Sequence, residues 1–357
     1  MSDTIRVLVV GCGNMGASHA RAYHTLDGFE IVGVVSRGPE TRGNLSAELG
    51  GLAQFDNFYT ALDVTKPDAV SINTLPDTHA EFALKSLESG AHIFVEKPIA
   101  LTVDQAESVK QTALRLGKKV VVGYILRQHP SWTLFIEKAQ TLGKPLVMRM
   151  NLNQQSTGEE WAWHKRLMDS FSPIVDCGVH YVDVMCQMTG AQPTKVHAIG
   201  ARLSDELKPD MYNYGQLQVI FDDGSVGWYE AAWGPMISEE AFFVKDVSGP
   251  KGCASIVKAA DGDDADSSDI DSHTKTNRIL VHHAALDESG NPLREDDIID
   301  TTDEPDHQEL CDREQAYFLK AIREDIDLTD HMSDAVNSLR IVLAADESVR
   351  TGEVVAL

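Results

Sequence analysis

Short apolar runs alternate with amphipathic stretches along the first 122 residues of the chain. The runs are rich in β-branched residues and apolar at nearly every position, which is typical of strands buried on both faces of a parallel sheet. They lie at 5–10, 29–35, 68–74, 92–96 and 119–124. The stretches between them that repeat with helical spacing are 15–26, 79–90 and 102–117. This alternation predicts right-handed β-α-β units and therefore a doubly wound parallel sheet.

The pattern changes after residue 122. Helices are predicted at 131–143, 174–189, 307–323 and 332–350. Strands are predicted at 145–153, 194–202, 214–221, 225–233, 253–257, 278–283 and near 241–247. Asp223 and Gly224 form a two-residue hairpin signal between two of these strands, which indicates antiparallel neighbours. The sequence predicts an α/β fold with a first domain over 1–122 and a second domain over 123–357. The second domain has an open, mainly antiparallel sheet, and its last helix is a candidate to pack back on the first domain.

Length and composition fit two globular domains. The chain has 357 residues, of which 43% are hydrophobic, enough for two domains of ~100–200 residues each. There is no apolar run of ~18 residues that would predict a membrane-spanning helix. The amino-terminal segment lacks a basic start and a small-residue cleavage site, and an early strand explains its apolar residues better than a signal peptide does. We therefore predict a cytoplasmic protein.

The formal net charge of −24 at pH 7 argues against two classes of partner. Such a field repels nucleic acids and anionic membrane surfaces, so neither is predicted. The densest acidic run, 261–271, is interpreted as a solvated loop, because it lacks the spaced glycine and terminal Glu of a calcium loop. The five cysteines are scattered and form no CxxC pair, which argues against a disulfide framework and a structural zinc site. No metal is predicted.

A glycine-rich turn follows the first predicted strand. Gly11, Gly13 and Gly16 form G-x-G-x-x-G directly after that strand and directly before a helix, the context in which this motif has a mechanism. The first glycine permits the tight turn, the second lets the backbone approach a pyrophosphate, and the third lets the helix pack closely on the strand. With Asn14 and Met15 between them, these residues are predicted to bind a dinucleotide.

The end of the second strand bears on which dinucleotide binds. An acidic residue about 20 positions after the glycines would bind the ribose 2′-hydroxyl of NAD, but Ser36 and Arg37 stand there. A hydroxyl and a guanidinium can bind a 2′-phosphate by charge-assisted hydrogen bonds, whereas a carboxylate would repel it. In the alternative interpretation, Arg37 is a solvated loop residue that only stacks on adenine. NADP is the predicted cofactor and NAD the alternative.

A lysine follows the strand predicted at 92–96, in the segment Val-Glu-Lys-Pro. Doubly wound folds bind their ligands at the carboxyl ends of the strands. Lys97 would therefore point into the cleft beside the nicotinamide, where its charge polarises a substrate oxygen. Pro98 permits a cis bond that would fix the direction of the lysine. The alternative is a surface lysine before a turn proline.

The segment Asp-Cys-Gly-Val-His-Tyr-Val-Asp at 176–183 lies in a predicted helix. Asp176 and His180 are four residues apart and share a face, which Asp183 extends. A carboxylate near an imidazole orients it and raises its basicity, so His180 is suited to accept a hydroxyl proton. An ordinary polar helix face is the alternative. A zinc site is disfavoured because no third ligand has recognisable spacing.

The order of these motifs resembles the Gfo/Idh/MocA oxidoreductases, the family of glucose–fructose oxidoreductase and inositol dehydrogenase. The resemblance covers essentially the whole chain and rests on the glycine motif, D-x-G-x-H, and the segments 74–98 and 334–355. It implies a Rossmann domain followed by an α/β domain whose large open sheet is often an oligomer interface. A homodimer or homotetramer is therefore expected.

The resemblance also implies roles for individual residues. His180 would transfer the proton, while Lys97 and Asp176 hold the reacting hydroxyl. The expected nicotinamide-side residues are Thr74, Pro76, His79 and Glu96. Of these, His79 resembles a residue of the cofactor loop or a helix cap rather than a catalyst. Many members carry Asp where this chain has Ser36, so their NAD preference is not assumed here.

Substrate contacts are expected from the segment 158–173, which replaces the glycine-rich lead-in that many relatives show. The residues that would line a sugar pocket are Trp161, Trp163, His164, Lys165 and Arg166. In the alternative, the segment is a lid that packs on the second domain without touching the ligand. Tyr124 and Arg127 are cleft candidates by position. His282 and His283 are interpreted as exposed strand or hairpin residues.

These features predict reversible hydride transfer between nicotinamide and a secondary hydroxyl or keto carbon of a sugar, inositol or related polyol. Two alternatives stay open. One is a nicotinamide-dependent enzyme that cleaves a glycosidic bond. The other is a dinucleotide-binding regulator without catalysis, against which the set of Lys97, Asp176 and His180 argues. The motifs specify neither the substrate nor the direction of the reaction.

Overall fold

The computed structural model describes residues 4–238, 244–257 and 273–357, which form two compact units. The first unit comprises Met1–Gln128 and Asp306–Leu339, and the second comprises His129–Pro305 and Arg340–Leu357. The acidic run at 261–271 lies outside the described residues, so its interpretation as a solvated loop stays a prediction.

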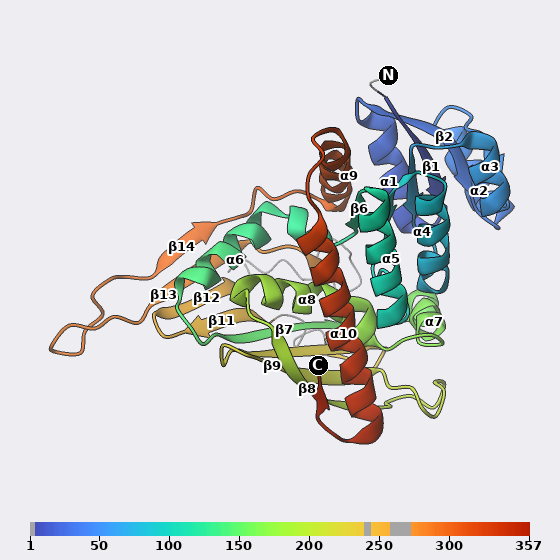
Figure 1. The fold of residues 1–357 in the computed structure, drawn as a ribbon. Coiled ribbons are helices and arrows are strands. Elements are labelled where there is room, and N and C mark those ends of the chain that lie inside the picture. Colours follow the sequence, from blue (N-terminus) through green and yellow to red (C-terminus); the bar gives the residue numbers. More distant parts are fainter. Residues whose placement is uncertain (1–3, 239–243, 258–272) are drawn as a thin grey trace. The chain divides into compact units, whose positions relative to one another are not determined.

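Within the described residues, the first unit is built on a six-stranded parallel sheet with the order β3-β2-β1-β4-β5-β6, of which β1, β2 and β6 are labelled in Figure 1. Its strands are β1 (Ile5–Val10), β2 (Phe29–Val35), β3 (Gln54–Phe55), β4 (Ala69–Ile72), β5 (His92–Val95) and β6 (Val120–Val122). The order reverses at the junction of β1 and β4, where sheets of this kind bind ligands at the carboxyl ends of their strands. The predicted doubly wound sheet is confirmed.

Helices connect these strands and pack on the sheet. They are α1 (Asn14–Thr25), α2 (Pro39–Glu48), α3 (Phe58–Thr65), α4 (His79–Glu88), α5 (Val103–Leu116) and the short 3-10 helices η1 (Pro76–Thr78) and η2 (Ile125–Gln128). Every residue of β4 and β6 is buried. Burial along the whole strand explains why the sequence pattern here is a nearly continuous apolar run rather than an alternation of apolar and polar residues.

The first unit also contains α9 (His307–Arg323) and the beginning of α10 (Thr329–Thr351), which differs from the predicted domain limits at 122 and 123. Phe318 of α9 enters the core, with its ring centroid 6.2 Å from that of Phe29 and 6.3 Å from that of Phe94. His331 of α10 accepts a hydrogen bond from the backbone N–H of Val122, 209 positions away in the sequence, at 2.9 Å. Local hydrophobic patterns carry no information about contacts at such a separation.

The second unit is built on a sheet with nine described strands in the order β14-β13-β12-β11-β7-β10-β9-β8-β15. The strands are β7 (Val147–Gln154), β8 (Pro193–Ala201), β9 (Tyr214–Phe221), β10 (Val226–Trp233), β11 (Lys245–Gly249), β12 (Gly252–Val257), β13 (Arg278–His283), β14 (Asp297–Asp300) and β15 (Val355–Ala356). All pairs are antiparallel except β7 with β10. The predicted hairpin joins β9 to β10, with φ +83° at Gly224. The predicted mainly antiparallel sheet is confirmed.

The helices of the second unit are α6 (Pro130–Thr141), α7 (Gly158–Leu167), α8 (Pro173–Thr189) and the end of α10. α6 and α8 pack on one face of the sheet. The opposite face carries exposed apolar side chains, among them Val147, Ile199, Ile220 and Val226. His282 and His283 lie at the end of β13, where their rings contact the carboxylates of Asp296 and Asp297 at 2.8 and 2.9 Å.

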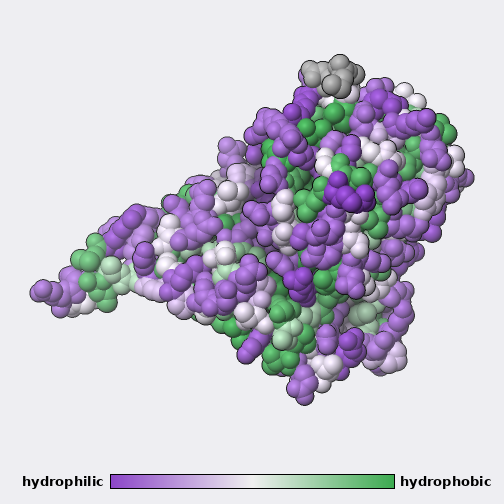
Figure 2. Space-filling view, viewed as in Figure 1, coloured by the Kyte–Doolittle hydropathy of each residue, from purple (hydrophilic) through white to green (hydrophobic). Residues whose placement is uncertain are grey.

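Several short elements are absent from the sequence-based prediction. They are α2, α3, α7, β3 and β14. Of the strand predicted near 241–247, the described part begins at Lys245. Among the described helices, none combines the length and apolarity of a transmembrane segment. Hydrophilic residues cover most of the face seen in Figure 2, in keeping with the 24% charged content.

Candidate functional site

The glycine turn between β1 and α1 is packed so closely that two of its positions exclude side chains. A Cβ on Gly11 would lie 2.3 Å from the backbone oxygen of Asn73, and one on Gly16 would lie 2.0 Å from that of Gly11. Gly11 also has φ +95°, which other residues rarely adopt. Gly11 and Gly16 are therefore required for β1, β4 and α1 to pack as they do.

Gly13 differs from its neighbours in the motif, because a Cβ there would meet nothing within 4 Å. Gly13 is the N-cap of α1, with no side-chain hydrogen bond capping the helix, and both Gly13 and Asn14 are exposed. The first N–H groups of a helix attract phosphate groups, and Met15 completes the first turn. The protein itself does not need glycine at position 13, whereas a pyrophosphate lying against the backbone would. The turn fits a dinucleotide.

Ser36 and Arg37 stand at the end of β2, where Ser36 is partly buried and Arg37 exposed. Arg42 on α2 donates from Nη1 to the backbone oxygen of Ser36 and, at 3.4 Å, to that of Phe55. No motif indicates this second arginine beside the turn. A hydroxyl and two guanidinium groups provide donors for an anion at this end of the strand.

The segment after β4 is held by His79, the first residue of α4. His79 is fully buried, and its Nε2 and Nδ1 lie 2.9 and 2.8 Å from the backbone oxygens of Thr74 and Pro98. Burial lowers the pKa of His79. Thr74 Oγ1 contacts Thr78 Oγ1 at 2.6 Å, and Pro76 is buried in η1. His79 thus joins the segment after β4 to the turn after β5.

The turn after β5 presents Lys97. Between residues 93 and 100, Lys97 alone is not buried, and the Lys97–Pro98 bond is cis. The buried Glu96 lies beneath it, with Oε1 at 2.8 Å from His19 Nε2 and Oε2 accepting the backbone N–H of Lys97 at 3.2 Å. A single cationic side chain is therefore presented from an otherwise buried turn.

Tyr124 and Arg127, the cleft candidates after β6, make contacts within the first unit. The Tyr124 hydroxyl lies 2.7 Å from Ser338 Oγ, and Arg127 donates to Asp334 at 2.7 Å. The Arg127 guanidinium also lies 5.8 Å from the centre of the Tyr124 ring. Both side chains thus tie the segment after β6 to α10.

Asp176 and His180 are set in the first two turns of α8. Between residues 171 and 185 they are the two that are partly exposed, and all others are buried. Ser172 caps the helix by accepting the backbone N–H of Val175 at 3.3 Å. Asp183, in contrast, is buried and accepts a hydrogen bond from Gln187 at 2.8 Å. A carboxylate and an imidazole therefore open together from one face of an otherwise buried helix.

The glycine of D-x-G-x-H has a packing reason. A Cβ on Gly178 would lie 3.1 Å from the ring of Tyr229 on β10, so glycine lets α8 lie close on the sheet. Tyr229 stacks on Tyr181 with ring centroids 5.0 Å apart, and burial raises the pKa of both phenols. Two neutral aromatic rings thus support the helix beneath Asp176 and His180.

Helix α7 contains the residues expected to line a sugar pocket, and several of them bind protein instead. Trp161 is buried and donates from Nε1 to Glu206 at 3.1 Å, and Lys165 pairs with the same carboxylate. Trp163 is 46% exposed, with the Arg166 guanidinium 5.8 Å from its ring centre. One side of α7 therefore packs on its own unit while Trp163 faces solvent.

His164 belongs to a cluster that no motif indicates. Its ring stacks on Trp233 with centroids 4.4 Å apart, and its Nδ1 contacts Ser156 Oγ at 2.8 Å. Trp233 donates from Nε1 to Gln154 at 2.7 Å. Burial lowers the pKa of His164 to about 4, and the nearby Asp176 opposes this shift. The ends of β7 and β10, α7 and the start of α8 are thus brought together by side chains far apart in the sequence.

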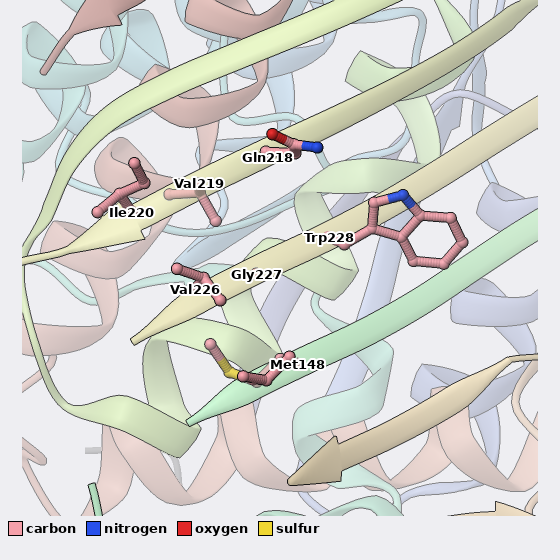
Figure 3. Close-up of a pocket in the computed structure, with 8 residues that line it drawn as sticks. Met148, Gln218, Val219, Ile220, Val226, Gly227 and Trp228 are labelled. Carbon is pink, nitrogen blue, oxygen red and sulfur yellow. The ribbon is translucent and has the colours of Figure 1, made fainter. Parts of the chain in front are cut away.

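The predicted reaction residues come from both units: Lys97 belongs to the first, and Asp176 and His180 to the second. A hollow elsewhere on the second unit is lined by residues of β7, β9 and β10 (Figure 3). Its lining residues are Val147, Met148, Gln218, Val219, Ile220, Val226, Gly227 and Trp228. No predicted site residue is among them.

Comparison with known proteins identifies the family of both units. Residues 5–124 match the "Oxidoreductase family, NAD-binding Rossmann fold", and residues 136–244 match the "GFO/IDH/MocA C-terminal domain". The chain is 28% identical over 241 residues to scyllo-inositol 2-dehydrogenase (NAD(+)) of Bacillus subtilis, covering 65% of this chain and 68% of the relative. It is 25% identical over 281 residues to D-glucoside 3-dehydrogenase of Escherichia coli, covering 72% and 78%.

Solved structures show the same fold. The scyllo-inositol dehydrogenase of Lactobacillus casei, solved with bound NAD(H) and scyllo-inositol, superposes with a TM-score of 0.75 at 20% identity and covers 99% of both chains. The two family matches together span more than half of the sequence, and the observed sheets are those that the motifs predict. The chain belongs to the Gfo/Idh/MocA family of NAD(P)-binding oxidoreductases.

Proposed function

We propose that this protein transfers a hydride reversibly between a nicotinamide dinucleotide and a secondary hydroxyl or keto carbon of a sugar, inositol or related polyol. The observation that carries the proposal is the opening of Asp176 and His180, and of no neighbour, from the buried start of α8. The relatives named above act on inositol and glucosides, which share ring carbons bearing secondary hydroxyls.

In this proposal, the chain's own residues handle the proton and the oxygen. His180 removes the hydroxyl proton in the oxidation direction and returns it in the reduction direction. Asp176 orients His180 and the reacting hydroxyl, and Lys97 stabilises the charge that develops on the substrate oxygen. The bound dinucleotide supplies the hydride acceptor or donor. Gly11, Gly13 and Gly16 hold it together with Asn14, Met15, Thr74, Pro76, His79 and Glu96.

Helix α7 is proposed to form one wall of the substrate pocket. His164 lies close enough to Asp176 for the carboxylate to influence the pKa of the imidazole, and Trp163 offers an exposed ring for the C–H face of a sugar. Aromatic rings and a few polar groups are the usual lining of small-molecule sites. Tyr124 and Arg127 would act by holding the segment after β6.

We propose NADP as the preferred cofactor. Ser36, Arg37 and Arg42 support this choice, because hydroxyl and guanidinium donors are suited to a 2′-phosphate. The solved relative from Lactobacillus casei carries NAD(H). The preference is therefore a property proposed for this chain and its Ser36 turn.

The first test is the absorbance of reduced nicotinamide when purified protein receives NADP⁺ or NAD⁺ with a panel of polyols. The panel contains aldoses, inositols, amino sugars, sugar acids and anhydrosugars, and the His180→Ala variant is the matched control. A rise with one polyol class, lost in the variant, supports the proposed reaction. A rise only with NAD⁺ keeps the reaction and overturns the cofactor choice. No rise with polyols or, in reverse, with their keto forms overturns the dehydrogenase proposal.

We also propose that two copies of this chain associate through the exposed face of the second sheet. Its apolar side chains Val147, Ile199, Ile220 and Val226 are 38–51% exposed, and Val147, Ile220 and Val226 line the hollow shown in Figure 3. The resemblance to the family implies the same face. Analytical ultracentrifugation of the wild type and of Val226→Lys tests it. A dimer or larger assembly that the substitution weakens is expected, and a monomeric wild type overturns the proposal.

A further inference from the structure

The first unit buries a polar cluster directly beneath the turn that presents Lys97. The Glu96 carboxylate contacts His19 Nε2 at 2.8 Å and accepts the backbone N–H of Lys97 at 3.2 Å. The other ring nitrogen of His19, Nδ1, lies 2.9 Å from Nε2 of Gln315 on α9. His19 and Gln315 are both fully buried. The Gln315 amide nitrogen donates to His19 Nδ1, which leaves the proton of the neutral ring on Nε2, so the two Glu96 contacts named here come from N–H donors and suit a carboxylate.

Glu314, the residue beside Gln315, is a second carboxyl group in the same cluster. It is 2% exposed, and neither of its oxygens has a hydrogen-bond partner among the described residues. One of its oxygens, the Cys311 sulfur and a ring nitrogen of His19 all lie within 4.8 Å of one another. No ion pair between Glu314 and a cation is found in the described chain.

Among the described residues, the charge that acts on the pKa of Glu314 is that of Glu96. From α1, His19 Nε2 lies 2.8 Å from Glu96 Oε1, and Tyr23 is a buried phenol whose pKa is raised by burial. From α9, burial likewise raises the pKa of the Cys311 thiol, which contacts His307 at 3.7 Å. From the turn after β5, the neighbouring charge is that of Glu96. Burial first, and the Glu96 charge second, raise the pKa of Glu314 well above its usual range.

Two buried carboxylates without a cation would cost several kcal/mol, whereas a neutral acid beside one carboxylate avoids this cost and can donate a hydrogen bond. The donor types of His19, Cys311 and Glu314 also occur in metal sites. Both ring nitrogens of His19 already have partners, however, and the thiol is neutral. A neutral Glu314 explains the cluster without a metal.

We propose that Glu314 is a positioning residue, held as a neutral acid so that Glu96 keeps its charge and its bonds to His19 and the Lys97 backbone. Glu96 then fixes the turn that presents Lys97, and His19 fixes α1, whose first turn faces the dinucleotide. The part of this inference that concerns Lys97 rests on the proposed function. The part that concerns α1 requires only that a dinucleotide binds.

The first test compares the stability of the wild type and Glu314→Gln by urea unfolding from pH 4 to pH 8. The folded wild type retains a proton that the unfolded chain releases above about pH 4.3, so its stability falls as pH rises towards the raised folded pKa. The ratio of wild-type to variant unfolding constants should grow by up to about tenfold per pH unit. Glu324→Gln, the same change at an exposed site after α9, should show no such trend. A variant that is less stable than the wild type at pH 8 would mean that Glu314 is ionised, and overturns the proposal.

The second test measures the affinity for the reduced dinucleotide by its fluorescence, in the absence of substrate. It tests whether Glu314 positions the residues around the dinucleotide. The affinity of the wild type for the dinucleotide should fall by roughly fivefold or more at alkaline pH as Glu314 ionises. A change of roughly fivefold is at the lower end of the usual coupling between linked sites. Glu314→Gln should retain its affinity over the same range, and Glu314→Leu should bind weakly at every pH. Parallel loss in the wild type and Glu314→Gln overturns the positioning role. Because no turnover is measured, this result is independent of whether the proposed reaction is correct.

Discussion

The two regions that hold the predicted site residues, one in each unit, are built differently. In the first unit, the dinucleotide turn is mainly backbone: Gly11 and Gly16 have no room for a Cβ, and Gly13 opens the end of α1. In the second unit, the region around α8 is made of side chains from separate elements, such as His164 stacked on Trp233. In the proposed function, the first region binds the part that all nicotinamide dinucleotides share, and the second contacts the substrate.

This difference determines what substitutions do. A site formed by main-chain atoms is disrupted when any side chain replaces a closely packed glycine. The chemical type of the side chain does not matter, because its Cβ clashes with main-chain atoms that cannot rotate away. A side-chain-made site fails according to the role of the group that is removed. The predictions below test this contrast in order of the expected size of the effect.

The largest effect is expected from Gly16→Ala. The new Cβ would lie 2.0 Å from the backbone oxygen of Gly11, so α1 must move away from β1. We expect a loss of several kcal/mol of unfolding free energy, the size of severe backbone or packing disruption, together with loss of dinucleotide binding. Thermal unfolding and cofactor fluorescence measure both.

Two matched glycines complete this experiment. Gly13→Ala should fold as well as the wild type but bind the dinucleotide more weakly, because its Cβ meets no protein atom within 4 Å. Gly43→Ala, in α2 with equally open surroundings, should leave binding unchanged and add up to about 1 kcal/mol of stability through helix propensity. If Gly13→Ala binds normally, the pyrophosphate does not lie against this turn.

The second prediction concerns His180. Replacing it by Ala should reduce kcat by about 10²–10⁴-fold, the usual contribution of a positioned general acid–base group. Dinucleotide affinity should not change, because the turn that binds it is in the first unit. His24→Ala, an exposed histidine of α1, is the control. Steady-state kinetics with the substrate identified by the polyol panel measure kcat, and near-normal turnover of His180→Ala would show that another group moves the proton.

The backbone-made half is the half that the sequence predicts well. The spacing of Gly11, Gly13 and Gly16 between a strand and a helix specifies a local geometry, and that geometry is observed. The parallel and antiparallel sheets also follow from local patterns, since the length and periodicity of each run depend only on neighbouring residues. Lys97 and the pair Asp176 and His180 are found by motif and prove to be the partly exposed positions of their segments.

The remainder depends on contacts that no local pattern encodes. Gln154, Trp233 and His164 meet at the ends of different elements, and nothing in their own segments indicates it. The return of α9 to the first unit rests on Phe318 among aromatic residues far away in the sequence. The two ends of each contact are 69 or more positions apart in the sequence, so their pairing appears only once the chain is folded.

The third prediction uses the buried state of His164. Its pKa is about 4 in the folded protein because of burial, while an unfolded histidine has a pKa of about 6.5. Between these pH values the unfolded chain therefore binds a proton while His164 of the folded chain stays neutral. The stabilisation of the folded protein by neutral His164 is present above pH 6.5 and is lost as pH falls towards 4. We expect a loss of about 2–3 kcal/mol over this range.

The variant His164→Asn separates this contribution from those of other groups. Its amide can still contact Ser156, and it does not titrate, so its stability should fall less steeply than that of the wild type on acidification. Urea unfolding at a series of pH values gives both slopes. Equal slopes of stability against pH in the wild type and the variant would mean that His164 is protonated or solvated in the folded protein. The region around His164 and Trp233 would then be less desolvated than its geometry indicates.

The smallest effect is expected at Ser36, where the dinucleotide region of the first unit depends on a side chain. Ser36→Asp places a carboxylate at the end of β2, where it would repel a 2′-phosphate and accept a ribose hydroxyl. Because the turn is partly exposed and Arg42 lies beside it, screening limits the change to about tenfold in the ratio of NADP to NAD affinity, in favour of NAD. Ser289→Asp, in the loop after β13, changes the net charge equally and should leave the ratio unaltered. An unaltered ratio in Ser36→Asp as well would show that the phosphate does not reach this turn, and that the whole dinucleotide is held by backbone.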